Sequence, residues 1–181
     1  MNIAFGVMHR IASGIFALGA AASMAAVFLV VFVNSALRYT YGRSFEWGEE
    51  LPIYLAIYGV MFGAALAYLQ DRHVRFTVVT DLLPRQFRLR LFVLVDLLMI
   101  GIGALLAYSG YLFIQQRGDV EASGIVGLAS SLAELTGFEF VATLGLMAPY
   151  QAALVFGGGM IALAALLRFL ARIADHQGRW R

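Results

Sequence analysis

The chain has 181 residues, of which 61% are hydrophobic and only 13% are charged. A soluble domain is about half apolar and carries about twice this share of charge. The excess of apolar residues therefore predicts an integral membrane protein, in agreement with a mean hydropathy of +0.81. The sequence contains no cysteine, which excludes disulfides, thiolate chemistry, iron–sulfur clusters and zinc–thiolate sites.

Four apolar stretches, at residues 11–37, 51–70, 91–116 and 140–167, meet the length of about 20 residues that a bilayer crossing requires. The last of them predicts a span at about 145–168. We therefore expect an all-α integral membrane fold with four transmembrane helices in a single membrane domain, residues 1–181. At about 1.5 Å per residue, three of these stretches exceed a hydrocarbon core of about 30 Å, so their helices should tilt or extend into the headgroups.

The arginines predict the orientation of the chain. Ten of the 13 basic residues fall on one side of the predicted spans: Arg10, Arg72, Arg75, Arg85, Arg88, Arg90, Arg168, Arg172, Arg179 and Arg181. The other side has only Arg38, Arg43 and Arg117, with seven acidic residues: Glu46, Glu49, Glu50, Asp119, Glu121, Glu134 and Glu139. The positive-inside rule places both termini in the cytoplasm. The arginines stand beside apolar spans, so the net charge of +2 does not indicate a nucleic-acid partner.

Two connecting segments are expected to lie at the membrane surface, in contact with lipid. Residues 74–83 are largely apolar but too short to span, and arginines follow Pro84, which predicts an interfacial segment near anionic headgroups. In residues 122–136, Ile125, Leu128, Leu132 and Leu135 recur at helical spacing. This stripe predicts a short amphipathic helix on the outer surface, with a re-entrant or partly buried segment as the alternative.

Few residues could carry chemistry, and the sequence indicates neither an enzyme nor a cofactor or metal site. The three histidines, His9, His73 and His176, all lie outside the predicted spans, which disfavours a membrane subunit that binds haem at bilayer depth. Asp96 is the one ionisable residue inside a predicted span. The interpretation we favour is an interfacial carboxylate paired with Arg88 or Arg90. An ion-coupling group and a polar contact with a partner helix remain alternatives.

The stretch from Arg38 to Arg75 combines charges with aromatic residues. Ser44 is a candidate helix cap, and Glu46, Glu49 and Glu50 share one helical face in or near the first turn of the next helix. An aromatic belt is expected at the outer interface, from Tyr39, Tyr41, Phe45 and Trp47. Membrane anchoring explains this pattern, and a docking surface for another protein is the alternative. Internal pairs between Arg38 and Glu49 or Glu50 are a further possibility.

The same stretch resembles the small membrane subunit, or DctQ-like component, of tripartite ATP-independent periplasmic (TRAP) transporters. The matching residues are Arg38, Tyr39, Gly42, Ser44, Phe45, Trp47, Glu49, Glu50, Leu51, Gly63, Ala64, Ala65, Ala67, His73, Val74, Asp81, Leu83 and Pro84. The chain departs from the pattern at Tyr58, where tryptophan is common, and at Thr77, where an acidic residue is common. Residues 119–139 match no motif.

The resemblance implies a scaffold subunit in the bacterial inner membrane. Its implied partners are a large, roughly twelve-helix subunit that holds the solute and sodium sites and a periplasmic solute-binding protein that delivers an organic acid. Arg43, Glu46, Glu49 and Glu50 are then expected near the docking surface, with Arg38, Tyr39, Gly42, Ser44, Trp47 and His73 as interaction or structural residues. Two other classes remain open: a membrane anchor of a respiratory complex, and a small exporter with Asp96 as its coupling group.

Overall fold

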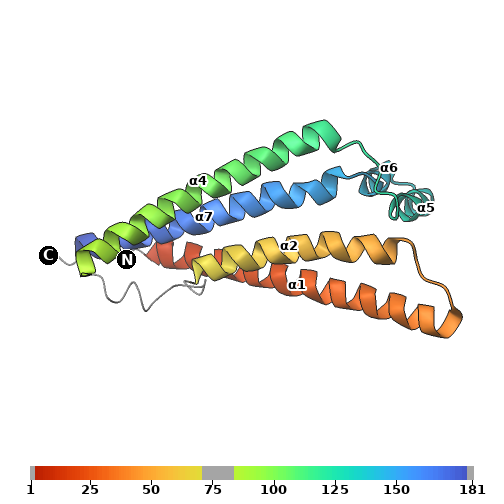
Figure 1. Cartoon of the computed structure of the whole chain (residues 1–181), viewed down its shortest axis with the longest axis horizontal. Coiled ribbons are helices and arrows are strands. Elements are labelled where there is room, and N and C mark those ends of the chain that lie inside the picture. Colours follow the sequence, from red (N-terminus) through yellow and green to blue (C-terminus); the bar gives the residue numbers. More distant parts are fainter. Residues whose placement is uncertain (1–2, 71–83, 179–181) are drawn as a thin grey trace.

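The computed structural model describes residues 3–70 and 84–178, and four long helices run along its length (Figure 1). They are α1 (Ile3–Tyr41), α2 (Trp47–Leu69), α4 (Arg85–Arg117) and α7 (Ala148–Gly178). Each contains a segment long and apolar enough to cross a membrane, at Gly6–Tyr41, Trp47–Leu69, Phe87–Arg117 and Ala148–Ala174. The predicted all-α fold with four membrane-spanning helices is thus confirmed. The predicted interfacial segment 74–83 and His73 lie outside the described residues.

The helices differ in length from the predicted spans. The spans were bounded at charged residues, and a charged residue can leave the lipid while the helical hydrogen bonds of the backbone continue through it. α1 begins eight residues before the predicted start of its span and ends at Tyr41, beyond Arg38. α7 begins later than the predicted residue 145, because Thr143–Gly145 forms a separate 3₁₀ turn, η1. Pro149 then occupies the first turn of α7, where its missing N–H costs no helical hydrogen bond.

The four helices form two antiparallel hairpins, α1–α2 and α4–α7, joined mainly where α2 packs against α7. The two hairpins converge at the end that holds both chain termini and diverge toward the opposite end (Figure 1). We name these the terminal end and the distal end. The buried core lies where the hairpins meet and is rich in small residues: Ala12, Phe16, Ala65, Tyr68, Leu69, Ala164, Ala165 and Leu167. Small side chains allow helices to approach closely in lipid.

The α4–α7 hairpin is the most closely packed pair, and glycines make this possible. A Cβ on Gly158 would come 2.6 Å from the carbonyl oxygen of Gly103 and would also strike the backbone nitrogen of Ala107. Gly157 lies against the side chain of Met61 on α2, whereas Gly159 has nothing within 4 Å of the position that a Cβ would take. Gly157 and Gly158 therefore allow α7 to approach α2 and α4 closely.

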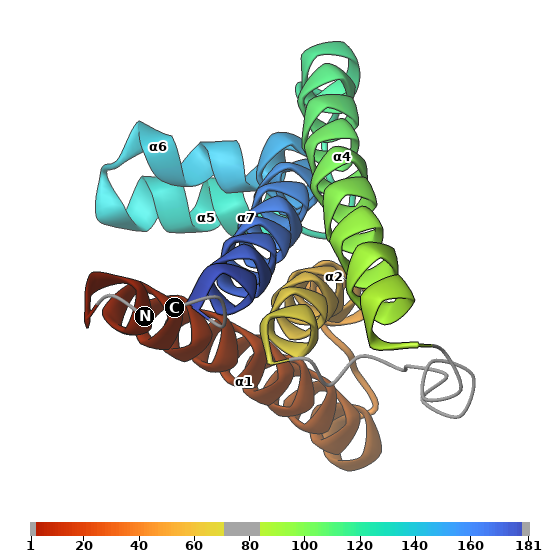
Figure 2. The same cartoon turned by 90° about the vertical axis from the view of Figure 1, so that its left-hand side faces the viewer.

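At the distal end, the chain between α4 and α7 forms a helical hairpin of α5 (Val126–Thr136) and α6 (Glu139–Ala142), which extends to one side of α7 (Figure 2). Its base is closed by hydrogen bonds from Ala122 N–H to Gly145 O (2.8 Å) and from Ala148 N–H to Gly118 O (3.0 Å). The predicted helix within 122–136 is confirmed.

The apolar residues of that helix differ in how far the rest of the chain covers them. Ile125 and Ala129 are buried against the base of the hairpin, but Leu132 is 38% exposed and Leu135 is 83% exposed. The helix runs outward from the bundle, so the described chain itself does not cover Leu132 and Leu135. Contact of this hairpin with the membrane surface remains a proposal.

Candidate functional site

The α1–α2 connection lies at the distal end and contains most of the predicted site residues. α1 ends at Tyr41, and Gly42 follows with a positive φ of 68°, a conformation that glycine adopts without the strain of a side chain. The chain then turns back to α2. Arg38, Tyr39, Arg43 and Ser44 are all exposed there, and Phe45 stacks on Trp47 with 5.1 Å between ring centroids.

Ser44 does not cap α2, so that prediction is wrong. The N-cap residue is Glu46, and its side chain forms no cap hydrogen bond. Instead, the side-chain carbonyl of Asn34 on α1 accepts a hydrogen bond from Phe45 N–H at 2.8 Å. Gly48 packs directly on the Asn34 amide, where a Cβ would come 2.5 Å from Asn34 Cγ. A polar residue one helix earlier therefore holds the start of α2.

The three glutamates at the start of α2 have different environments. Glu46 and Glu49 are exposed, whereas Glu50 is partly buried. Glu50 accepts a hydrogen bond from Ser123 Oγ at 2.9 Å and one from Gly124 N–H at 3.1 Å. The carboxylate therefore fixes the connection between α4 and α5 to α2. The internal pairing considered for Glu50 exists, but its partners are Ser123 and Gly124 rather than Arg38.

Tyrosines continue this contact along α2 and α7. Tyr54 stacks on Tyr150 with 4.3 Å between ring centroids, and its hydroxyl lies 3.4 Å from Met147 Sδ. One turn further, Tyr58 donates a hydrogen bond to the carbonyl oxygen of Pro149 at 2.5 Å. These contacts satisfy polar groups between two membrane helices, where an unpaired hydroxyl is costly. Together with Glu50, they join the two hairpins near the distal end.

We predict that Glu50→Ala loosens the α4–α5 connection without unfolding the bundle. The substitution removes two hydrogen bonds to a carboxylate, each of which contributes about 1.5–3 kcal/mol in a favourable setting. Amide hydrogen exchange should become faster in residues 119–126. The neighbouring Glu49→Ala, at an exposed position, is the matched control. Unchanged exchange in Glu50→Ala would show that the contact does not hold this segment.

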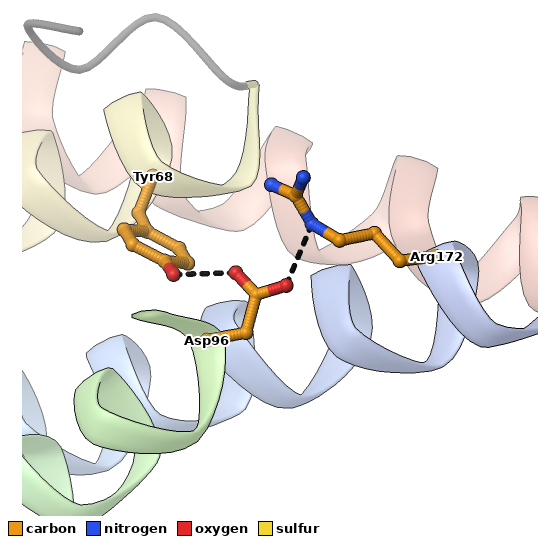
Figure 3. A network of polar contacts seen from close by, with 3 residues as sticks. All are labelled: Tyr68, Asp96 and Arg172. Carbon is orange, nitrogen blue, oxygen red and sulfur yellow. Dashed lines mark hydrogen bonds and ion pairs between the residues drawn. The ribbon is translucent and has the colours of Figure 1, made fainter. Parts of the chain in front are cut away.

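A second polar cluster joins three helices near the terminal end (Figure 3). Asp96 on α4 is 1% exposed. Its Oδ1 accepts a hydrogen bond from the hydroxyl of Tyr68 on α2 at 2.6 Å, and its Oδ2 lies 2.6 Å from Nε of Arg172 on α7. The Nε–Oδ2 contact has the distance of an ion pair but not the alignment of a hydrogen bond. The Arg172 guanidinium also lies over the ring of Phe92, 4.7 Å from its centroid.

This geometry corrects the favoured interpretation of Asp96. The carboxylate lies inside the bundle, and the ion pair that the structure describes is with Arg172 of another helix rather than with Arg88 or Arg90 of its own. Sequence reasoning placed Asp96 at the interface because it is close to the basic end of its span. Pairing with an arginine 76 positions later cannot be read from spacing along the chain.

The sequence analysis did not single out several residues whose side chains join segments of the fold, among them Asn34, Tyr68, Gln151 and Arg172. Gln151 is buried, and its side-chain amide donates to the carbonyl oxygen of Arg117 at 3.3 Å, which links the start of α7 to the end of α4. The signal that could have identified Gln151 is that it is a polar residue within an apolar span. Arg172 was counted only as an orientation charge. No group of three or more metal-ligating side chains occurs among residues 3–70 and 84–178.

Comparison with known proteins assigns the family. The family model of the tripartite ATP-independent periplasmic transporters, DctQ component, matches residues 27–175. Similarity also extends to the sialic acid TRAP transporter small permease protein SiaQ of Vibrio cholerae, which is 30% identical over 109 residues, or 60% of this chain and 62% of that protein. A Haemophilus influenzae protein assigned by name to the TRAP transporter small permeases is 36% identical over 61 residues, 34% of this chain.

The aligned part of the chain spans 62% of the length of the Vibrio cholerae relative and 38% of that of the Haemophilus influenzae relative. The family match is broader, since it begins within α1, includes α2, α4 and the α5–α6 hairpin, and ends within α7. It therefore covers both polar clusters and the whole α1–α2 connection. The chain belongs to the DctQ family, the small membrane component of TRAP transporters.

Proposed function

We propose that this chain is the scaffold subunit of a TRAP transporter and pairs with the large membrane subunit that holds the solute and sodium sites. Family membership supports a transporter component of the inner membrane rather than an enzyme. The proposed cargo is an organic acid delivered by a periplasmic binding protein and taken up with sodium. The proposed orientation places the basic terminal end in the cytoplasm and the acidic distal end in the periplasm.

The observation that supports a scaffold role most directly is the use of the buried polar groups. Asp96 is engaged by Tyr68 and Arg172, Glu50 by Ser123 and Gly124, and Gln151 by the chain at Arg117. Carriers bind solute near the bilayer midplane with broken helices and polar groups. Here the polar contacts join α2, α4 and α7 to one another and α2 to the α4–α5 connection. They therefore support a rigid body rather than a solute pathway, and they disfavour the exporter in which Asp96 couples ions.

Reconstitution tests this proposal. Vesicles that contain this chain alone should accumulate no organic acid, whereas vesicles with the large subunit and the soluble binding protein should do so under an inward sodium gradient. The chain should also co-purify with the large subunit. Uptake by this chain alone, or full uptake by the large subunit without it, would contradict a scaffold role.

We further predict that the double charge reversal Glu46→Lys/Glu49→Lys lowers uptake several-fold but leaves the membrane complex intact. Both side chains are exposed at the distal end, and opposite charges placed on a docking surface slow association. Uptake and co-purification should be measured on the same preparation. The control Glu134→Lys/Glu139→Lys makes the same change of charge on the α5–α6 hairpin. An equal loss of uptake in both variants would indicate a general effect of the negative charge at the distal end rather than a docking surface at Glu46 and Glu49.

A further inference from the structure

α4 packs one face on α7 and leaves the opposite face exposed, at the edge of the helix bundle (Figure 2). Gly103 and Gly110 lie directly against α7. At about 100° per residue, Tyr108 lies about 140–160° around the helix from both glycines. Further exposed residues lie within about 60° of Tyr108 on the same side of the helix. We name this set the outer α4 face: Gly101, Ala104, Leu105, Tyr108, Tyr111 and Gln115.

The depth of Tyr108 in the bilayer decides what can cover it. As a helix, the apolar stretch 91–116 is about 39 Å long, against a hydrocarbon core of about 30 Å. Tyr108 comes about 12 Å before the distal end of that stretch. The excess length is either shared between the two headgroup regions or taken up by tilt. In both cases the Cα of Tyr108 lies about 7–9 Å inside the hydrocarbon, below the interface where aromatic belts form.

The outer α4 face carries polar groups at about this depth. Tyr108 is 60% exposed and Tyr111 is 52% exposed. Gln115 donates a hydrogen bond to the Tyr111 hydroxyl oxygen at 2.9 Å, but within residues 3–70 and 84–178 the Tyr108 hydroxyl has no hydrogen-bond partner. Helical side chains lean toward the N-terminus of their helix, which for α4 is at the terminal end. The Tyr108 hydroxyl therefore does not extend toward the nearer, distal headgroups.

A protein helix suits this face better than lipid does. Hydrocarbon offers no hydrogen-bond acceptor, and burial of a hydroxyl without an acceptor is costly, whereas a neighbouring membrane helix can supply one. Gly101 has nothing within 4 Å of its Cβ position, so a helix can approach α4 closely there and at Ala104. α1 provides the contrast, because its large exposed side chains from Ile11 to Val33 are all hydrocarbon or thioether, as contact with lipid requires.

We infer that the outer α4 face packs against a transmembrane helix of the large subunit, which accepts a hydrogen bond from Tyr108 and fits over Gly101 and Ala104. The inference rests on the proposed function, which supplies a partner within the membrane but not the face that meets it. The α4–α7 hairpin then holds the large subunit, and lipid covers the exposed face of α1.

Photo-crosslinking in the complete transporter tests the contact. A benzophenone amino acid in place of Leu105 should label the large subunit. The same probe in place of Phe28, which is exposed within the α1 span, should not. Labelling of lipid or of a second copy of this chain from position 105, no labelling there, or equal labelling of the large subunit from both positions would overturn the inference and leave the scaffold function standing. A wild-type chain that forms no complex with the large subunit would instead contradict the proposed function.

Two glycines provide a matched pair of variants. Gly101 on α4 and Gly14 on α1 are both exposed, and nothing lies within 4 Å of the Cβ position of either. Gly101→Leu should therefore not lower the melting temperature of the isolated chain. It should weaken binding to the large subunit about tenfold or more, because the added side chain fills space that the partner helix occupies. Gly14→Leu should change neither quantity. If the two variants bind the large subunit equally well, no helix packs on the outer α4 face.

Tyr108→Phe tests the hydrogen bond by itself, since it removes only the hydroxyl. The affinity for the large subunit should fall by about three- to tenfold, the range expected for one hydrogen bond between membrane helices. The melting temperature of the isolated chain should not change, because the hydroxyl has no partner in the described chain. Wild-type affinity in this variant would overturn the hydrogen bond that the inference assigns to Tyr108.

Discussion

Arg172→Leu is expected to destabilise the bundle by about 3 kcal/mol, because it removes the cation beside a carboxylate that is 1% exposed. Breaking a buried ion pair costs about 3–5 kcal/mol, and the lower value applies because Tyr68 still donates to Asp96. The melting temperature of the purified chain in detergent measures the effect. Arg117→Leu, at an exposed arginine on α4, is the control and should change the melting temperature little.

The double variant Asp96→Leu/Arg172→Leu tests whether the two charges act as a pair. The double variant also removes the carboxylate that Arg172→Leu leaves without its ion-pair partner, so it should be more stable than Arg172→Leu alone. The coupling energy from the double-mutant cycle should then be about 1–3 kcal/mol. Additive losses would show that Asp96 and Arg172 stabilise the bundle independently and that the ion pair in Figure 3 contributes little.

Gly158→Leu should separate α4 from α7, and the chain should then no longer form a stable complex with the large subunit. A Cβ at this position would meet the backbone of α4 at Gly103 and Ala107, and backbone atoms cannot move aside as a flexible side chain can. Overpacking a core typically costs about 1–3 kcal/mol, and a leucine against a helix backbone belongs at the upper end. Yield and melting temperature after size-exclusion chromatography in detergent are the measurements.

The neighbouring glycine provides the control for this prediction. Gly159 has nothing within 4 Å of its Cβ position, so Gly159→Ala should be neutral or stabilise the chain by about 0.5–1 kcal/mol, as a helical glycine replaced by alanine does. Gly158→Ala should be destabilising at the same time. If both alanine variants had the same stability, the α4–α7 contact would not depend on the glycine backbone.

The sequence alone was sufficient for the membrane fold and the family resemblance. Length and apolarity identify a bilayer crossing because a lipid-exposed backbone must satisfy its hydrogen bonds within one helix, and this requirement is local. The stretch from Arg38 to Pro84 was likewise sufficient to indicate the DctQ-like component, which the match over residues 27–175 confirms. The segment 122–136 was correctly predicted to contain a helix, since its periodicity is also local.

Only the tertiary structure decided which polar groups meet. Asp96 pairs with Arg172, Glu50 binds Ser123 and Gly124, and Asn34 rather than Ser44 holds the start of α2. These partners come from different segments of the chain, and their meeting depends on the register and rotation of each helix against its neighbour. Every apolar face in lipid satisfies the same hydropathy pattern, so the pattern does not select one register. That choice comes from close contacts such as Gly158 on Gly103, which exist only once the helices have packed.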